Sequence, residues 1–420
     1  MSSGLSKALA LLTMLAAIRL RRSSSPSVAP ASQVMSIVIR HPWLAVGAVA
    51  TLLAVGALLV VVSGVVPLKA SSGHWAITEM FLQFAKRRSV ATHAIGIKVP
   101  PLDDRAMVLK GAGHFEGGCR PCHGGPGEPL PRIPQAMTPK APALASHIGT
   151  WTPAELFSIV KHGIKLTGMP AWPALQRDDE VWAMVAFLRV LPDLDRAEYL
   201  RLVNGDTPAM MTTPPIEGLA GAPETRVPDA DVGAIPAAVT GSCGRCHGVD
   251  GRGREVGAFP RLAGQSETYL LSALKAFAGG ARHSGIMEPI ATGLDELAMR
   301  EVVRYYSGLG MSQARPASAP ASPSDSMPGA AIAQRGIPAK KVPSCADCHG
   351  PTKTDRNPAY PELAGQNAEY LVLQLQLFAR RERGGSEYAH LMPPVASALT
   401  TEQMEAVTGY YASLPGPLQP

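Results

Sequence analysis

The sequence has no cysteine outside a repeated motif. All six cysteines of the 420 residues lie in three C-x-x-C pairs, each followed directly by histidine. Charged residues make up only 17% of the chain and aromatic residues 5%. No convincing run of alternating strand residues is present, whereas amphipathic helical spacing recurs over 179–190, 294–306 and 401–411. These absences exclude a structural disulfide framework and predict an all-α fold.

An excess of positive charge is missing from most of the chain. The formal net charge is +6, but residues 1–40 hold five basic residues and no acidic one. The rest of the chain carries 34 basic and 33 acidic residues, so it is nearly neutral. A nucleic-acid surface needs Lys and Arg gathered on the folded part of a protein. Nucleic-acid binding is therefore excluded as a function.

Charge is absent altogether from residues 43–66. A helix of this length crosses a hydrocarbon core of about 30 Å. Arg40 and an earlier arginine cluster precede it, which by the positive-inside rule places the N-terminus in the cytoplasm and the rest outside. We therefore expect a single-pass protein of the bacterial inner membrane with its domains in the periplasm. The competing interpretation is a cleaved signal peptide, which has a shorter apolar region and a small-x-small site.

An internal repeat occupies the second half of the chain. CGRCHG at 243–248 recurs as CADCHG at 345–350, and FPRLAGQ at 259–265 recurs as YPELAGQ at 360–366. The region around Cys119 is a more distant third relative. We refer to these three regions as unit 1 (105–205), unit 2 (239–311) and unit 3 (329–420).

The segments between the units have distinct compositions. The predicted organisation is an N-terminal extension (1–34), a transmembrane anchor (35–70), a juxtamembrane segment (71–104), unit 1, a linker (206–238), unit 2, a Pro/Ser-rich linker (312–328) and unit 3. Met35 would make a natural start, and we expect the extension to be either untranslated or disordered. The juxtamembrane segment suits an amphipathic helix that lies on the membrane surface or packs on unit 1 or a partner subunit.

The three C-x-x-C-H motifs carry the chemistry. On a helical turn, residues i, i+3 and i+4 share one face, so two sulfurs and one imidazole point in the same direction. The sulfurs can form thioethers with the vinyl groups of one haem, and the imidazole then reaches the iron. The motif therefore predicts three covalently attached haem c groups, through Cys119, Cys122 and His123, Cys243, Cys246 and His247, and Cys345, Cys348 and His349.

Other uses of C-x-x-C fit this sequence less well. A thioredoxin-like redox pair lies in a βαβ pattern, and none is visible. A zinc site uses two pairs about 15–20 residues apart, whereas these motifs are separated by roughly a hundred residues. Haem attachment explains all three histidines as well as all six cysteines.

The second axial ligand of each iron is expected to be methionine. Met169 is followed directly by proline, Met287 by Glu-Pro and Met392 by Pro-Pro, and each is expected in a loop ahead of a terminal amphipathic segment. A His/Met iron has a raised potential suited to carrying electrons. Alternative ligands are Met137 in unit 1, and His283 and His390 near the other two methionines. Met299 and Met404 fall inside the terminal segments and are expected to be core residues.

On these motifs each unit resembles a class I cytochrome c domain. The pair formed by units 2 and 3 resembles the di-haem cytochromes c4, through C-x-x-C-H-G, P-x-L-A-G-Q, the Met-Pro segment and the paired tyrosines. Unit 1 resembles single-haem domains with a GMPAW-type methionine loop. The resemblance implies three cytochrome c-like domains in tandem after one N-terminal transmembrane helix.

The resemblance also implies a role for three prolines. In class I cytochromes, a proline after the haem motif offers its carbonyl to the other nitrogen of the axial histidine. Pro142, Pro260 and Pro361 match that element in the three units. Such a bond fixes the orientation of the imidazole and increases its donor strength.

The expected function is electron transfer rather than catalysis. The expected donor is a respiratory or quinol-oxidising complex or a periplasmic dehydrogenase, and the acceptor a terminal oxidase or a soluble cytochrome. One alternative is a dedicated subunit of a membrane dehydrogenase or oxidase; three-haem dehydrogenase subunits agree in haem count and size but attach through their C-terminus. A second is a haem enzyme, such as a cytochrome peroxidase or a sulfur-compound dehydrogenase.

Overall fold

The computed structural model describes residues 42–66, 68–205, 235–254, 257–309, 327–351 and 355–416. The predicted N-terminal extension and most of the linkers 206–238 and 312–328 lie outside these residues. The chain divides into two compact parts, residues 1–72 and 73–420.

Among the described residues of the first part, the main element is helix α2 (Pro42–Val62). Its residues Trp43–Val62 are long and apolar enough to cross a membrane, and none of them is buried in the protein. The same length and composition also suit a signal sequence.

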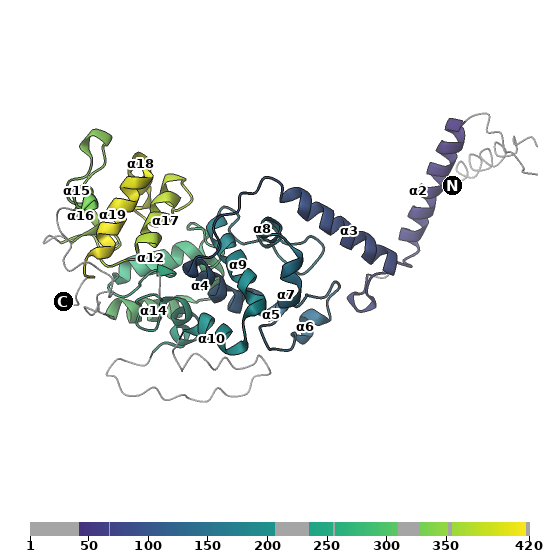
Figure 1. The fold of residues 1–420 in the computed structure, drawn as a ribbon, viewed down its shortest axis with the longest axis horizontal. Coiled ribbons are helices and arrows are strands. Elements are labelled where there is room, and N and C mark those ends of the chain that lie inside the picture. Colours follow the sequence, from purple (N-terminus) through teal and green to yellow (C-terminus); the bar gives the residue numbers. More distant parts are fainter. Residues whose placement is uncertain are drawn as a thin grey trace, which may run out of the picture. The chain divides into compact units, whose positions relative to one another are not determined.

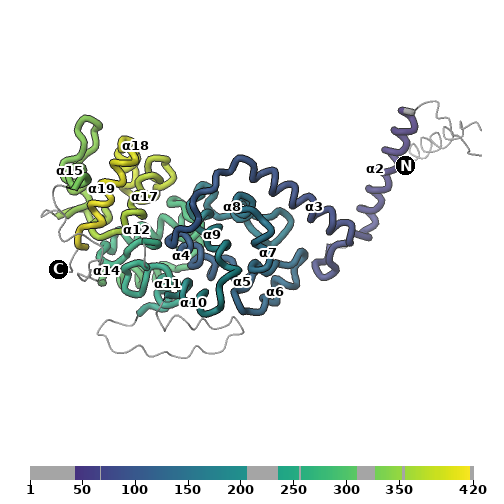
Figure 2. Tube along the Cα trace, viewed as in Figure 1, coloured from purple at the N-terminus to yellow at the C-terminus, as the bar shows by residue number. Residues whose placement is uncertain are grey.

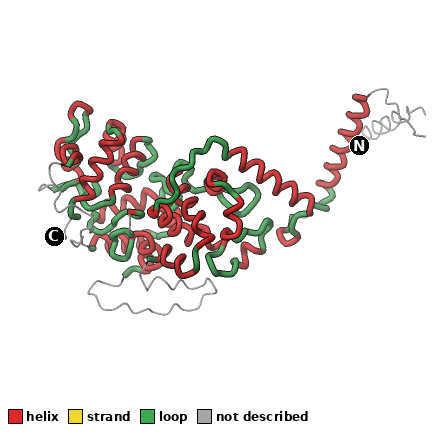
Figure 3. Tube along the Cα trace, viewed as in Figure 1, coloured by secondary structure: helices red, strands yellow, loops and turns green. Residues whose placement is uncertain are grey.

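The second part is built from helices and loops, as Figures 1 and 3 show. Within the described residues the only β pairing is an isolated bridge between Ile337 and Val342. The predicted all-α fold is therefore confirmed. The helices of this part are α3 (Ala76–His93), α4 (Arg105–His114), α5 (Arg120–His123), α6 (Arg132–Gln135), α7 (Leu144–His147), α8 (Pro153–His162), α9 (Asp178–Val190), α10 (Arg196–Asn204), α11 (Gly244–His247), α12 (Glu267–Ala278), α13 (Met287–Thr292), α14 (Glu296–Gly308), α15 (Pro328–Arg335), α16 (Ala346–His349), α17 (Ala368–Ala379), α18 (Met392–Ala398) and α19 (Thr401–Ser413).

Unit 1 is held together by the crossing of α4 and α9. Gly111 of α4 makes this close approach possible, because a Cβ at that position would lie 2.3 Å from the carbonyl oxygen of Ala183. Phe115, Phe187 and Tyr199 fill the core beside the crossing and are fully buried. The terminal helix expected over 179–190 is thus confirmed, and its buried face anchors the unit.

Unit 3 repeats this arrangement, with α15 crossing α19 (Figure 2). Here Gly329 occupies the close position, since a Cβ would lie 2.0 Å from the carbonyl oxygen of Ala406. In unit 2, α12 packs against α13 and α14 around a separate core that includes Val239, Val303 and Tyr306. Met299 and Met404 are buried in α14 and α19, as expected of core residues. The domain boundaries themselves stay a prediction.

Helix α3 exposes an apolar stripe. The side chains of this stripe are between 51% and 70% exposed: Trp75, Ile77, Met80, Phe81 and Phe84. Its later turns contact unit 1, where Arg87 donates to the carbonyl oxygen of Thr150 at 3.3 Å and lies over the ring of Trp151. The segment therefore packs on unit 1 at one end and leaves its apolar stripe uncovered by the described residues.

Candidate haem-attachment sites

All three C-x-x-C-H motifs adopt the same local structure. The cysteines and histidine follow one helical turn, completed by α5, α11 or α16. The glycine after each histidine has a positive φ, 71° at Gly124, 77° at Gly248 and 71° at Gly350. Glycine adopts this backbone without steric cost, so the chain can leave the helix immediately after the histidine.

Each motif histidine is oriented by a proline carbonyl. Nδ1 lies 2.9 Å from the carbonyl oxygen of Pro142 for His123, of Pro260 for His247 and of Pro361 for His349. These are the three prolines that the family resemblance points to. Because a carbonyl oxygen only accepts, Nδ1 must carry the proton and Nε2 keeps its lone pair. The geometry thus presents Nε2 as the metal-binding nitrogen, although its role as an iron ligand stays a prediction.

Burial keeps these imidazoles neutral. It lowers the pKa of His123, His247 and His349, while the bond to the proline carbonyl opposes that shift. A metal-binding histidine must be neutral. The sites are therefore prepared for a metal before one is bound.

The motif cysteines are unpaired and half-buried. Burial raises the pKa of Cys119 to about 12 and the pKa of Cys243, Cys246 and Cys345 to about 11. In the described part of the chain, no group of three or more His, Cys, Asp or Glu side chains is placed to hold a metal ion. These sulfurs fit thioether bonds to a porphyrin better than a zinc site.

Units 2 and 3 share one largely apolar cavity. The predicted donors of both units line it: Cys243, Cys246, His247, Met287, Cys345, Cys348, His349 and Met392. A single cavity that holds two complete donor sets fits two haem groups lying close together.

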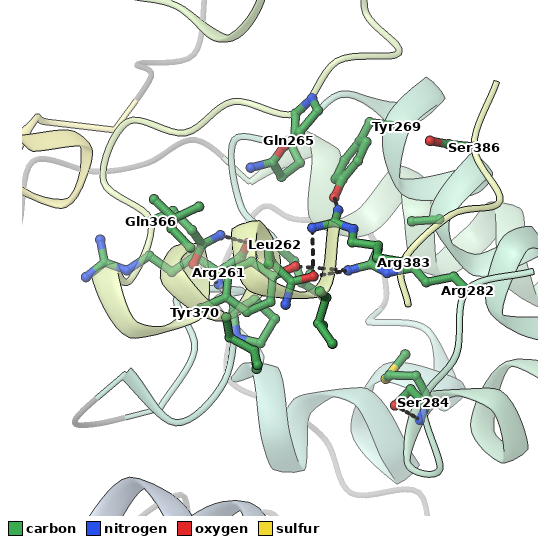
Figure 4. A pocket seen from close by; sticks show the side chains of 18 of the residues that line it. Arg261, Leu262, Gln265, Tyr269, Arg282, Ser284, Gln366, Tyr370, Arg383 and Ser386 are labelled. Carbon is green, nitrogen blue, oxygen red and sulfur yellow. Dashed lines mark hydrogen bonds between the residues drawn. The ribbon is translucent and has the colours of Figure 1, made fainter. Parts of the chain in front are cut away.

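Two half-buried arginines line this cavity (Figure 4). Arg282 of unit 2 donates to the hydroxyl of Tyr370 at 3.1 Å, and Arg383 of unit 3 donates to the hydroxyl of Tyr269 at 3.2 Å. Gln374 Oε1 accepts from both guanidinium groups. These partners are neutral, and buried charges are normally balanced by charges of opposite sign. The carboxylates of haem propionates would supply that balance, so the residues present fit the cofactor.

Units 2 and 3 also contact each other through reciprocal hydrogen bonds. Gln265 pairs with the backbone of Glu362 through bonds of 2.7 and 3.0 Å. The equivalent Gln366 pairs with the backbone of Arg261 through two bonds of 2.9 Å. The P-x-L-A-G-Q element therefore serves the contact between units as well as the histidine.

The methionine candidates occupy two kinds of position. Met169 lies in a loop, as expected, whereas Met287 and Met392 begin the short helices α13 and α18. A loop was expected at all three, so the expectation was wrong for units 2 and 3. Of the alternative ligands, His283 lines the shared cavity, while His390 is exposed and lies 3.0 Å from the carbonyl oxygen of Glu387. Met137 touches the Met169 loop, with its Cε 2.1 Å from where a Cβ on Gly168 would lie.

The charged residues around these sites were not predicted from the sequence. Arg282 and Arg383 follow Tyr269 and Tyr370 at the same distance in the repeat, and this shared spacing is a signal that could have found them. The carboxylate of Glu180 and the guanidinium of Arg177 lie buried where unit 1 meets unit 2. No repeat or motif marks them.

Parts of this chain are similar to known proteins. Residues 106–188 match the family model described as "Cytochrome C oxidase, cbb3-type, subunit III". A "Thiosulfate dehydrogenase electron acceptor" of Stutzerimonas stutzeri is 35% identical over 190 residues, 43% of this chain and 82% of that protein. A "Cytochrome c4" of Pseudomonas aeruginosa is 32% identical over 187 residues, 44% and 89% of the two chains. The crystal structure of reduced cytochrome c4 from Pseudomonas stutzeri aligns with 28% identity and a TM-score of 0.39, over 44% of this chain and 100% of that one.

The fold, the motifs and these relatives define a c-type cytochrome with three covalently attached haem c groups. More particularly, the chain belongs to the cytochrome c4 family, to which it adds a further cytochrome c unit and an apolar N-terminal helix.

A histidine outside the motifs should make the stability of unit 1 depend on pH. Burial lowers the pKa of His114 to about 4, and its ring lies 4.7 Å from that of Trp172. Since this pKa is below the unfolded value near 6.5, the unfolded chain gains a proton first as the pH falls. The contribution of His114 is complete above about pH 6.5, and about 2–3 kcal/mol is lost between pH 6.5 and 4.

Urea unfolding at pH 7, 5 and 4 measures this loss. The variant His114→Phe, which cannot take up a proton, should lack this part of the acid destabilisation. Equal losses in the two proteins would show that other groups are responsible.

Proposed function

We propose that this protein carries electrons on the periplasmic side of a bacterial inner membrane. Its donor is a respiratory dehydrogenase or quinol-oxidising complex, and its acceptor is a terminal oxidase or a soluble cytochrome. The haem groups supply one-electron chemistry, and the protein supplies their ligands, orientation and surroundings. The observation that supports this proposal is that each unit has two motif cysteines and a histidine whose Nδ1 lies 2.9 Å from a proline carbonyl oxygen, with a candidate methionine ligand further along the chain.

The methionines favour an electron carrier over an enzyme. Catalysis at a haem needs an open coordination position, whereas Met169, Met287 and Met392 would close that position in each unit. A thioether ligand also raises the potential of the iron. In this proposal the chain keeps substrates away from the metal and offers only a path for electrons.

Two segments support attachment to a membrane. Helix α2 has the length and composition of a membrane span. Helix α3 follows it closely in the chain, exposes the apolar stripe that includes Ile77 and Phe81, and carries Lys86, Arg87 and Arg88 further on. Apolar and basic residues on one helix suit the boundary between lipid tails and anionic headgroups.

A second candidate for the donor comes from the relatives. Two of them, from Stutzerimonas stutzeri and Thiomonas intermedia, are named thiosulfate dehydrogenase electron acceptors and are 35% and 36% identical to this chain. By analogy, this protein accepts electrons from a thiosulfate-oxidising enzyme. It then links the oxidation of a sulfur compound to the respiratory chain.

Rapid mixing of the detergent-solubilised full chain with each donor tests the proposal. A competent donor, either a quinol-oxidising complex or a thiosulfate dehydrogenase with thiosulfate, should reduce all three haems with a second-order rate of about 10⁵–10⁷ M⁻¹s⁻¹. An oxidised soluble cytochrome should then reoxidise them. High-spin iron in the resting protein, together with turnover of hydrogen peroxide, would contradict the carrier role and favour a peroxidase.

A further inference from the structure

The segment that presents Met287 is held from outside its own unit. Residues 283–287 precede and begin helix α13 of unit 2. Two residues of unit 1, Arg177 and Glu180, make hydrogen bonds to this segment. Arg177 immediately precedes helix α9, and Glu180 lies in its first turn. Their side chains are only 8% and 6% exposed. The contact is therefore buried, although it joins parts of the chain more than a hundred residues apart.

The carboxylate of Glu180 is the centre of this contact. Its Oε1 accepts from the hydroxyl of Ser284 at 2.6 Å, and its Oε2 accepts from the backbone N–H of Gly285 at 2.7 Å. Arg177 lies 3.0 Å from the same carboxylate and also donates to the carbonyl oxygen of His283 at 2.8 Å. Arg177 also forms an ion pair with Asp179 at 2.8 Å. Unit 1 thus contacts three successive residues of unit 2 through Arg177 and Glu180.

This contact reaches the backbone of Met287 through one hydroxyl. Ser284 Oγ donates to Glu180, which leaves its lone pairs directed at the backbone N–H groups of Ile286 at 3.3 Å and Met287 at 3.0 Å. The hydroxyl can rotate freely in the absence of the carboxylate. Glu180 therefore selects the orientation in which Ser284 holds Met287.

The same carboxylate also touches the methionine segment of unit 1. Oε2 accepts from the indole Nε1 of Trp172 at 3.1 Å, and Trp172 lies three residues after Met169. The Met169 loop has supports within its own unit. The backbone N–H of Met169 donates to Thr167 Oγ1 at 3.1 Å, and the backbone N–H of Trp172 donates to the carbonyl oxygen of Lys161 at 2.9 Å. The Met287 segment also has a support within unit 2, since the backbone N–H of Ser284 donates to Glu288 Oε1 at 2.8 Å. Glu180 bonds to this segment directly, however, whereas it reaches the Met169 loop only through Trp172. Loss of the carboxylate should therefore disturb unit 2 more than unit 1.

We propose that Glu180 is a positioning residue for the second haem, because from unit 1 it holds the segment that presents Met287 to the iron. The inference rests on the proposed ligation by Met287. It makes the ligation of the second haem depend on the docking of unit 1. Met392 in unit 3 follows instead a 3₁₀ turn, Ala389–Leu391, of its own unit.

Competition with imidazole on the oxidised full chain tests this proposal. Without the carboxylate, the N–H of Gly285 and the hydroxyl of Ser284 lose a buried partner, and a loss of that kind changes an equilibrium by about tenfold. In Glu180→Ala, imidazole should therefore bind the second haem about tenfold more tightly than in the parent protein. The first haem should change less, and the third haem not at all. Glu180→Gln keeps an acceptor for Gly285 and should restore most of the parent affinity.

The three haems are distinguished by the NMR signals of their methionine methyl groups, assigned with Met169→Ala, Met287→Ala and Met392→Ala. Glu116→Ala is the matched control, because Glu116 is a carboxylate of unit 1 with 5% exposure whose partners, Tyr199 and Arg120, lie within that unit. It should leave the second haem unchanged. Glu180→Ala without effect on the second haem, or with an equal effect on all three, overturns the proposal. Unchanged imidazole binding in Met287→Ala would instead overturn the ligation on which it rests, without bearing on whether the chain carries electrons.

Discussion

Replacement of Met392 by alanine should lower the reduction potential of the third haem by a sizeable share of the about 0.8 V that axial ligands span. A thioether favours the ferrous state, so its loss favours the ferric state and leaves a position open to water. The absorption spectrum should then show one high-spin haem of the three and lose one third of the Met–Fe band. Redox titration followed by absorbance measures both effects.

The structure favours Met392 over the neighbouring histidine as the ligand. Met392 lines the cavity shared by units 2 and 3 and packs beside Phe378. His390 is exposed, and its Nδ1 lies 3.0 Å from the carbonyl oxygen of Glu387. A histidine ligand would give a lower potential in the parent protein and leave no Met–Fe band to lose.

Met404→Ala is the matched control for this experiment. Met404 is a methionine of the same unit, 6% exposed in α19, with neighbours in the core that include Val342 and Leu399. Its truncation should cost about 2–5 kcal/mol of stability and leave the potential of the third haem near the parent value. A parent-like spectrum in Met392→Ala would place the ligand elsewhere in the unit.

Replacement of Gly329 by valine should destabilise unit 3 by about 3 kcal/mol. A Cβ at this position would lie 2.0 Å from the carbonyl oxygen of Ala406 and 2.8 Å from the Cα of Val407, so α15 and α19 would have to move apart. Backbone atoms of a helix cannot yield as the end of a flexible side chain can. Denaturant unfolding followed at the third haem measures the loss.

Helix α19 also offers the control for this substitution. Gly409 lies inside α19, and a Cβ there would meet nothing within 4 Å. Gly409→Ala should therefore stabilise unit 3 by about 1 kcal/mol, because alanine has the higher helix propensity. Equal stability of Gly329→Val and the parent protein would show that the helix crossing is looser than the structure indicates.

Local signals in the sequence predicted much of the fold. The terminal helices expected over 179–190, 294–306 and 401–411 occur as α9 (Asp178–Val190), α14 (Glu296–Gly308) and α19 (Thr401–Ser413). Amphipathic spacing marks the buried face of such helices, and capping residues such as Thr400 mark their start. The segments that begin with Met287 and Met392 were expected to be loops ahead of the terminal helices, and both contain proline. Proline is tolerated in the first turn of a helix, so α13 and α18 form there nevertheless.

Contacts between units could not be predicted in the same way. The histidines and their prolines lie within one unit, 12 to 19 residues apart, and the family resemblance pointed to each pair. Glu180 and Ser284 are separated by 104 residues. A buried carboxylate at such a junction has no spacing rule, since its partner is decided by how two folded surfaces meet.

The crossed bonds between units 2 and 3 have a consequence for how the pair is assembled. Gln265 and Gln366 each form hydrogen bonds with the backbone of the opposite unit. Arg282 and Arg383 each donate to a tyrosine hydroxyl of the opposite unit, Tyr370 and Tyr269. Such a self-complementary contact has the two-fold character of a homodimer interface. Each unit therefore supplies both kinds of group that the contact needs. Units 2 and 3 thus correspond to a dimer joined on one polypeptide. Their sequences can diverge, while the one-to-one ratio of the two units is kept.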